Sequence, residues 1–339
     1  MTTPPNPKRR FLEIIEKFRG CPIAVYGDLV ADEFVYGEIS RISREAPVLI
    51  LKYRESHFVP GGAANAISNL AELGAAPVPL GILGVDEAGK ALRRQFHRAR
   101  VPLSLVRAVK GYQTPTKTRY SAGSVHSSRQ QVLRIDRESL FLHTPETTAA
   151  TRRDLEALIR RCRGMIVSDY GFGFVNPEVA GQILSAEGLP VTVDSRFRLL
   201  NYPRLTACTP NEPEVEEALG MRIGNDLGKL EEAGRKLLRK LKLRAVLITR
   251  GRDGMALFVA GRKPVHIPIF GTDEIADVTG AGDTVIAVFT LALAVGASFE
   301  EAARLSNYAG GIVVMKRGTA TVSAAELQEA VARDADQVL

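Results

Sequence analysis

The chain has 339 residues, of which 45% are hydrophobic and 24% charged, a balance typical of a soluble globular protein with one large α/β core. No apolar run approaches the roughly 18 residues of a membrane-spanning helix, so we expect no membrane contact. The net charge of +7 is spread over helical patterns with no Trp and no interleaved aromatic residues, which favours solvated helix faces over a nucleic-acid site.

Apolar runs alternate with helical patterns along the chain, after a polar, Pro-rich segment, residues 1–10, that we expect to be a disordered leader. The predicted strands cover residues 22–28, 78–81, 164–168, 191–194, 207–209 and 245–249. Residues 62–74 and 285–295 predict helices, the second apolar on nearly every face and therefore buried. This order predicts an α/β fold with a mainly parallel sheet covered on both faces, and a ligand site at the carboxyl ends of the strands.

Two segments interrupt this alternation. Residues 34–58 and 114–135 carry alternating, β-branched sequence without a helical period. We predict that they form a small sheet inserted into a single domain spanning residues 11–330. Such a sheet has exposed edges, so we expect it to act as a lid over the site and to join two copies into a homodimer.

The three cysteines, Cys21, Cys162 and Cys208, are scattered. They show neither a zinc-ligand spacing nor a disulfide pattern. This usage predicts a reducing, cytoplasmic location.

Asp277-Val278-Thr279-Gly280-Ala281-Gly282-Asp283-Thr284 is the most informative stretch of the chain. Gly280 and Gly282 lack the Cβ atoms that keep a backbone away from a ligand, and the free N–H groups at a helix start favour an anion. Asp283 would then accept a proton from a hydroxyl group that attacks a bound phosphate. A structural turn also explains the glycines, but the added carboxylate favours a phosphotransferase.

This stretch resembles the C-terminal signature of the ribokinase-like carbohydrate kinases, the phosphofructokinase-B group, and the resemblance extends from about Ile23 to Ser323. It implies a three-layer α/β/α ribokinase-like fold and a reaction that uses ATP and Mg²⁺. It further implies that Asp283 is the catalytic base and that the amides of Gly280, Ala281 and Gly282 form an anion hole.

The same resemblance assigns the sugar side of the site. Gly61-Gly62-Ala63-Ala64-Asn65 looks like the N-terminal glycine pair of the family, so Gly61, Gly62 and Asn65 are predicted to bind the sugar. Asp28 and Asp32 follow the first strand, where carboxylates pair with sugar hydroxyls. A turn cap for Asp28 and a buried polar anchor for Asn65 are the structural alternatives.

Pro210-Asn211-Glu212-Pro213-Glu214 resembles the Asn-x-x-Glu motif of the family, which implies that Glu214 helps to place Mg²⁺, directly or through water. Helix capping by Asn211 is compatible with this role. Thr249-Arg250-Gly251-Arg252-Asp253-Gly254 resembles the segment beside the nucleotide phosphates. The implied nucleotide-side residues are Asn211, Glu214, Thr249, Gly251, Gly254, Asp277 and Asn307.

Within the family, the chain resembles the heptose-7-phosphate kinases of lipopolysaccharide precursor synthesis. Ser40 to Val48 reads like the Ser-Arg-Ile-Ser-Pro-Glu-Ala-Pro-Val of that branch, with Arg44 in place of Pro. Arg41 and Arg129, in the predicted lid, would bind the sugar phosphate through forked donors. Phe172 stands where the branch has Lys, and Asp194-Ser195-Arg196 replaces Asp-Pro-Lys. Another sugar or nucleoside as acceptor, or a catalytically silent sugar sensor, remains an alternative.

Overall fold

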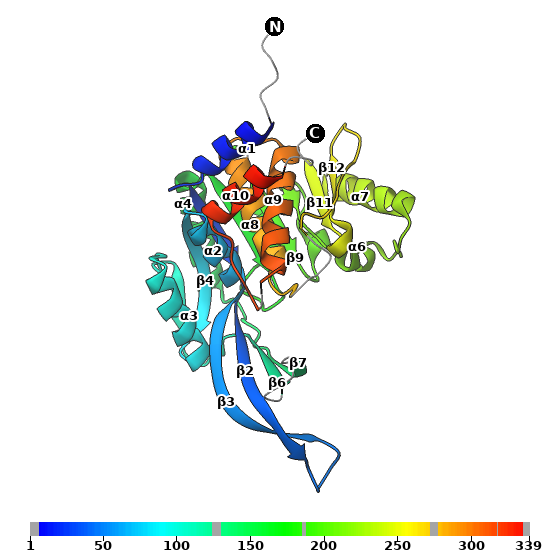
Figure 1. Ribbon diagram of the computed structural model, residues 1–339. Helices are drawn as coiled ribbons and strands as arrows, with labels where there is room; N and C mark the ends of the chain where they lie inside the picture. Colours follow the sequence, from blue (N-terminus) through cyan, green and yellow to red (C-terminus); the bar gives the residue numbers. More distant parts are fainter. Residues whose placement is uncertain (1–6, 124–129, 185–187, 272–276, 317, 335–339) are drawn as a thin grey trace.

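The computed structural model describes residues 7–123, 130–184, 188–271, 277–316 and 318–334, and its centre is one large sheet (Figure 1). Within these residues the sheet has nine strands. In spatial order they are β13 (Val265–Ile267), β12 (Met255–Val259), β11 (Ala245–Thr249), β10 (Ala207–Cys208), β9 (Val191–Ser195), β8 (Gly164–Asp169), β1 (Pro22–Gly27), β4 (Ala76–Gly84) and β5 (Val106–Val109). The strands from β11 to β5 are parallel, whereas β12 and β13 pair antiparallel.

Side-chain alternation along the strands separates two apolar layers. Ile23 and Val25 of β1 belong to one buried cluster, and Ala24 and Tyr26 belong to the other, as the two-residue period of a strand requires. The first face is covered by α1 (Pro7–Glu16), α2 (Ala63–Glu72), α3 (Glu87–Arg98), α8 (Ala281–Ala294), α9 (Phe299–Val314) and α10 (Ala324–Arg333). The second face is covered by α4 (Pro145–Arg161), α5 (Pro177–Leu184), α6 (Glu212–Leu219) and α7 (Leu227–Leu241). The predicted three-layer α/β/α architecture is confirmed.

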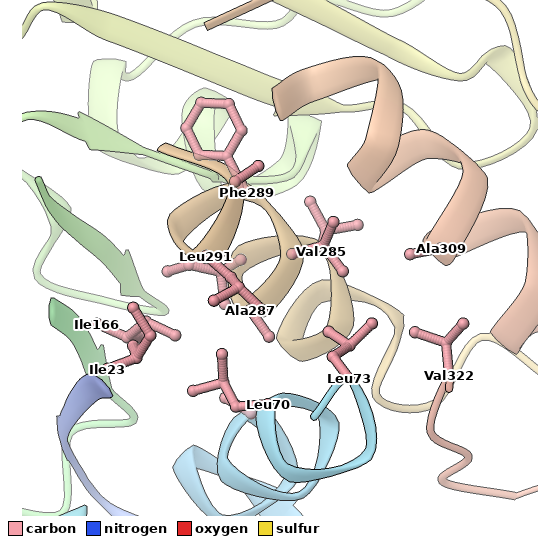
Figure 2. Close-up of a cluster of buried hydrophobic side chains, with 14 of the residues drawn as sticks. Ile23, Leu70, Leu73, Ile166, Val285, Ala287, Phe289, Leu291, Ala309 and Val322 are labelled. Atoms are coloured by element: carbon pink, nitrogen blue, oxygen red, sulfur yellow. The ribbon is translucent and has the colours of Figure 1, made fainter. Parts of the chain in front are cut away.

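Helix α8 lies in the middle of the first layer. Val285, Ala287 and Leu291 pack near Leu70 of α2 and Ile166 of β8, as Figure 2 shows. The helix is apolar on nearly every face because other helices and the sheet surround it. This rigid setting fixes the amino end of α8, where the glycine-rich stretch lies.

The inserted segments form a second sheet, as predicted. In the described residues its order is β3 (Leu49–Gly62), β2 (Leu29–Ile42), β6 (Thr116–Gly123) and β7 (Gln130–Arg137), with β2 antiparallel to β3 and parallel to β6. The β2–β3 hairpin projects far from the body of the protein (Figure 1). The predicted bounds of 34–58 were too narrow, because the first residues of β2 are fully buried and show no alternation.

The N-terminal prediction needs a correction. Residues 7–10 belong to α1 and not to a disordered leader, while residues 1–6 lie outside the described residues. Phe11, Ile14, Ile15 and Phe18 recur at helical spacing and bury one face of the segment, a pattern that the Pro- and Arg-rich start conceals. In the part of the chain that is described, no helix combines the length and the apolar character needed to cross a membrane.

Two short 3₁₀ helices complete the described part of the fold. They are η1 (Leu199–Asn201) and η2 (Gly251–Asp253), and each follows the carboxyl end of a central strand.

Candidate active site

A cavity of about 580 Å³ lies where the carboxyl ends of the central strands, the start of α8 and the small sheet meet. Asp194 lines the cavity from the end of β9, Thr249 lines it from the end of β11, and Tyr170 lines it from the loop after β8. Lys117 and Arg134 face it from β6 and β7 of the small sheet. The cavity therefore lies at the carboxyl ends of the strands, where the sequence predicts a ligand site.

Asp283 is the carboxylate at the centre of this arrangement. Its Oδ1 accepts a hydrogen bond from the Tyr170 hydroxyl at 2.9 Å, and its Oδ2 accepts one from Asn65 Nδ2 at 3.0 Å. Burial raises its pKa from an ordinary value near 3.8 to about 7, although both hydrogen bonds and the nearby Lys117 ammonium lower it. A carboxylate with a pKa near neutrality is suited to accept a proton at physiological pH.

Gly280 is required by the geometry around Asp283. Its φ of 80° lies in the left-handed region, and it is the N-cap of α8. A Cβ atom at this position would lie 2.5 Å from Asn65 Nδ2 and 2.8 Å from the Thr319 methyl group. Gly282 lines the cavity with open space where its Cβ would be. Ala281 donates its amide to the Val278 carbonyl at 3.3 Å, which leaves the described part of the predicted anion hole to the Gly280 and Gly282 amides.

Two cations in the cavity are available to a ligand. Lys117 lies 4.9 Å from the centre of the Tyr170 ring, and desolvation lowers its pKa. Arg196 lies over the ring of Phe197 at 5.3 Å. Neither has a carboxylate within ion-pair distance among the described residues, whereas Arg119 pairs with Asp32 at 2.6 Å. Unpaired cations in a partly closed cavity favour a phosphorylated ligand.

Two further carboxylates, Asp194 and Glu214, line the same cavity. Burial raises the pKa of both, and for Asp194 the nearby charges of Glu214 and Asp283 raise it further. A divalent cation would relieve this concentration of negative charge, and carboxylate oxygens are the ligands that Mg²⁺ prefers. No group of three or more His, Cys, Asp or Glu is placed to hold a metal ion within the described ranges, so a metal here would need oxygens from its substrates as well.

Several predicted sugar ligands have other partners. Asn65 holds Asp283 and the Gly280 carbonyl, and its Oδ1 accepts from Asn69, so its groups are directed at the base and the start of α8. Asp28 is not among the residues lining the cavity, since its Oδ2 accepts the amides of Tyr170 and Phe172. Both side chains thus have buried partners within the protein, and sugar binding by either stays a prediction.

Of Asp32 and the glycine pair, Asp32 and Gly62 line the cavity, whereas Gly61 is needed for packing. Asp32 lines the cavity and also accepts the Thr319 hydroxyl at 3.1 Å. Gly62 lines the cavity and begins α2 with a φ of 54°. Gly61 is needed for packing, because its Cβ would lie 2.6 Å from the Asp32 carboxylate.

Of the two predicted phosphate ligands of the lid, Arg41 does not line the cavity. Arg41 is exposed on the distal part of β2, nine residues beyond Asp32, a span of about 30 Å in an extended strand. It therefore cannot reach the cavity of its own chain. Arg129 lies outside the described residues.

The nucleotide-side predictions fall into two groups. Asn211, Glu214 and Thr249 line the cavity, and Asn211 with Glu214 also forms a capping box at the start of α6. The remaining residues do not line the described cavity, namely Gly251, Gly254, Asp277 and Asn307.

Three residues of this second group, Asp277, Asn307 and Gly254, have structural roles. Asp277 accepts the amides of Thr279 and Gly318, and Asn307 donates to the Pro268 carbonyl at 2.8 Å. Gly254 has a φ of 80° and leaves no room for a Cβ beside the Ile267 carbonyl.

Three side chains that line the cavity were not among the predicted site residues, namely Tyr170, Lys117 and Arg134. The signal for Lys117 was present, because Lys117 and Arg119 alternate in a predicted strand and therefore share a face. No sequence pattern placed Tyr170 on Asp283, since the two residues are separated by 113 positions.

The fold and the site together define a phosphotransferase of the ribokinase-like class. Ribokinase from Arabidopsis thaliana, solved with ribose and ATP, has a TM-score of 0.72 at 23% identity, covering 92% of this chain and 99% of that one. Phosphofructokinase-2 from Escherichia coli, solved with potassium, has a TM-score of 0.73 at 18% identity, covering 92% and 98%. At these identities the similarity shows the fold.

Residues 23–155 and 183–326 match the pfkB family carbohydrate kinase, and the chain belongs to this family. It is 39% identical over 318 residues to the bifunctional protein HldE of Desulfatibacillum aliphaticivorans, and 40% identical over 316 residues to that of Caulobacter vibrioides. These alignments cover 93% and 91% of this chain but 64% and 63% of the relatives, so the chain spans about two thirds of their length or slightly less.

Proposed function

We propose that the protein transfers the γ-phosphate of ATP to the anomeric hydroxyl of a phosphorylated sugar, D-glycero-D-manno-heptose 7-phosphate, giving the 1,7-bisphosphate. The single observation that carries the proposal is the environment of Asp283. A buried carboxylate with a pKa near neutrality stands at a glycine-rich helix start, in a cavity that also holds the unpaired cations Lys117 and Arg196. The resemblance to the heptose-7-phosphate kinases supports the choice of sugar.

In the proposed reaction Asp283 accepts the proton of the sugar hydroxyl as its oxygen attacks the γ-phosphorus. The new O–P bond forms while the bond to the β-phosphate oxygen breaks, and ADP leaves with that oxygen. The amides of Gly280 and Gly282 stabilise the charge on the transferred group, at about 3 kcal/mol for a well-placed donor. Lys117 and Arg196 bind phosphate groups in place of the predicted Arg41. Gly251, Gly254, Asp277 and Asn307, which lie outside the cavity lining, border the nucleotide in this proposal.

Mg²⁺ fits the carboxylates of Glu214 and Asp194, which face the cavity beside Asn211 and Thr249. When bound, the ion would neutralise the phosphate charge between these carboxylates and the nucleotide. Asp32, paired with Arg119, is available to a sugar hydroxyl through its remaining lone pairs.

We also propose that two copies associate through the outer face of the small sheet. Lys117, Arg119 and Arg134 face the cavity, so Leu133 and Ile135 point to the other side of the sheet. Leu133 is 53% exposed and Ile135 41% exposed. An apolar sheet face of this kind favours association with a second copy. The three free, buried cysteines support a reducing, cytoplasmic location.

The test measures ADP release from Mg-ATP with heptose 7-phosphate, fructose 6-phosphate, ribose, fructose and adenosine as acceptors. We expect turnover with heptose 7-phosphate and a loss of about 10³-fold or more in kcat for Asp283→Asn. Asp226→Asn, which keeps an exposed helix cap, is the matched control. Turnover with another acceptor would retain the mechanism and reject the sugar. No turnover with any acceptor would reject heptose 7-phosphate as the substrate and favour a silent sugar-binding protein or an acceptor outside this panel.

A further inference from the structure

A second cavity, larger than the active-site cavity, lies at the opposite edge of the central sheet. Its volume is about 910 Å³, and it opens between the segments that lead into β9, β10 and β11, the turn after β12 and the link from α8 to α9. Because β9, β10 and β11 are parallel, these segments lie at the amino ends of the strands whose carboxyl ends form the active site. The proposed phosphoryl transfer uses no residue of this cavity.

Four cations converge on the second cavity from separate loops. Arg204 precedes β10, Lys242 and Arg244 precede β11, and Arg262 follows β12. The described residues that line the cavity include no Asp or Glu, and none of the four cations pairs with a carboxylate within the described chain. Like charges gathered in one hollow repel each other, so the arrangement favours an anion as its ligand.

The loops that carry these cations are locked to one another by backbone hydrogen bonds. Arg204 donates its amide to the Leu241 carbonyl at 2.7 Å, Arg244 donates to Thr206 at 3.0 Å, and Ala260 donates to Arg244 at 3.1 Å. The backbone segments that carry the cations are therefore held in place before any ligand binds, so binding needs no ordering of these loops.

The backbone at two of the four cations is strained. Arg204 has a φ of 63° and Lys242 a φ of 53°. Among the described residues only Arg100 is a further non-glycine residue with positive φ. Such conformations are unfavourable for residues with a side chain, and they persist where the surrounding structure enforces them.

One part of the wall of the second cavity is apolar and aromatic. The Arg244 guanidinium lies 5.4 Å from the centre of the Phe299 ring, and Leu205 and Val259 lie alongside. Phe299 is also the first residue of α9, a helix whose start is capped by Ser298 and Glu301. The cavity thus offers charge for phosphate groups and an apolar surface for an organic group.

We propose that this cavity is a second binding site, specific for a small organic molecule with two or more phosphate groups. Its ligand is bound by Arg204, Lys242, Arg244 and Arg262 and packs against Phe299. Helix α8 runs between the two sites, with Asp283 in its first turn at the active site and Leu293 at the second cavity.

The absence of Trp from the sequence permits a site-specific test. Phe299→Trp places a single tryptophan in the second cavity, and Phe197→Trp, in a separate protein, places one beside the active site. Each full-length protein is titrated with ADP, fructose 1,6-bisphosphate and inorganic tripolyphosphate at constant ionic strength. We expect a saturable change in the emission of the Phe299→Trp protein with ADP or the bisphosphate. Whichever of ADP and fructose 1,6-bisphosphate has the lower Kd identifies the class of organic group that the site prefers. Tripolyphosphate, which has no organic group, should have a higher Kd than that ligand.

Charge variants then test the assigned residues. Adding Arg204→Gln and Arg262→Gln should raise the Kd at the Phe299→Trp reporter by about tenfold or more, since each cation contributes charge-assisted hydrogen bonds. Arg94→Gln with Arg98→Gln removes the same charge from exposed positions of α3 and should leave that Kd within about twofold.

Three outcomes would overturn the proposal: no saturable change at Phe299→Trp, a change only at Phe197→Trp, or equal weakening by the two charge pairs. Calorimetry of the chain without a reporter gives the same comparison should Phe299→Trp fail to fold, with one binding site fewer expected after Arg204→Gln and Arg262→Gln. Neither readout depends on turnover, so failure of the kinase proposal and failure of this one are distinguishable.

Discussion

Tyr170 donates its hydroxyl hydrogen to Oδ1 of Asp283 over 2.9 Å, while Asn65 donates to the other oxygen. Both donors stabilise the ionised carboxylate and so lower its pKa, against the opposing effect of burial. The balance leaves the pKa of Asp283 at about 7. Tyr170 thus acts on the proposed reaction through the base.

Tyr170→Phe should move the pH dependence of catalysis. Without the hydroxyl donor the pKa of Asp283 rises, so the increase of kcat with pH should shift upward by about one unit. The variant should be several-fold slower near neutrality and approach wild-type kcat in alkaline solution. The measurement is kcat between about pH 6 and pH 10, with Tyr53→Phe in the exposed hairpin as control. A uniform loss of kcat without a shift would contradict this role.

Asp283→Asn should stabilise the protein in alkaline solution. Because burial raises the pKa of Asp283 from 3.8 to about 7, its contribution to stability is fully present below pH 3.8 and is lost as the pH rises through 7. An amide carries no charge and avoids this loss. The variant should gain on wild type by about 2 kcal/mol between pH 5 and pH 8.

Urea unfolding at these two pH values measures that gain. Asp226→Asn at an exposed helix cap, where Asn caps as well as Asp, should show no comparable gain. The prediction would be wrong if the free energy of unfolding of wild type, relative to that of Asp283→Asn, increased from pH 5 to pH 8. That result would show that ionising this buried carboxylate does not destabilise the protein.

The two glycines before the base should respond in opposite ways to alanine. Gly280→Ala forces a Cβ against Asn65 and Thr319 at a positive φ, and should lower the free energy of unfolding by about 1 to 3 kcal/mol. Gly282→Ala meets open space in the first turn of α8 and should raise it by up to about 1 kcal/mol. Equal effects of the two substitutions in thermal or urea unfolding would refute this assignment of roles.

The fold was predictable because its signals are local. The strands β1, β8, β9 and β11 are short apolar runs, and the apolar character of residues 285–295 identified a buried helix. The bounds of the lid strands and the start of α1 were less certain. There, full burial in β2 and an early Pro-Lys-Arg-Arg sequence hide the periodicity on which prediction depends.

The site was predictable where one loop contains the chemistry. Gly280, Gly282 and Asp283 are neighbours in sequence, and the structure keeps them together at the cavity. The contacts of Asn65 and Asp28 with Asp283 and the amides after β8 could not be predicted, because these partners are distant in sequence. The distance of Arg41 from the cavity of its own chain could not be predicted, because it depends on the length of β2 and not on residue type.

Lys117→Met should weaken binding of a phosphorylated acceptor. Lys117 is an unpaired cation in the cavity within the described structure, so its loss should raise the KM for heptose 7-phosphate by about tenfold. Arg41→Met, at the exposed hairpin, should change this KM by less than about twofold if the cavity of each chain works alone. A larger increase in KM for Arg41→Met than for Lys117→Met would show that Arg41 contacts the acceptor in the site of a second copy.

Replacing the apolar outer face of the small sheet should separate the proposed dimer. Leu133→Glu with Ile135→Glu places two charges on a face that we expect to be buried between copies. Light scattering should give the mass of two chains for wild type and of one chain for the variant. Leu142→Glu is the control, because Leu142 is 75% exposed and lies outside this sheet. This variant should keep the mass of two chains. A wild-type mass of one chain, or a variant that keeps the mass of two, would exclude this face as the interface.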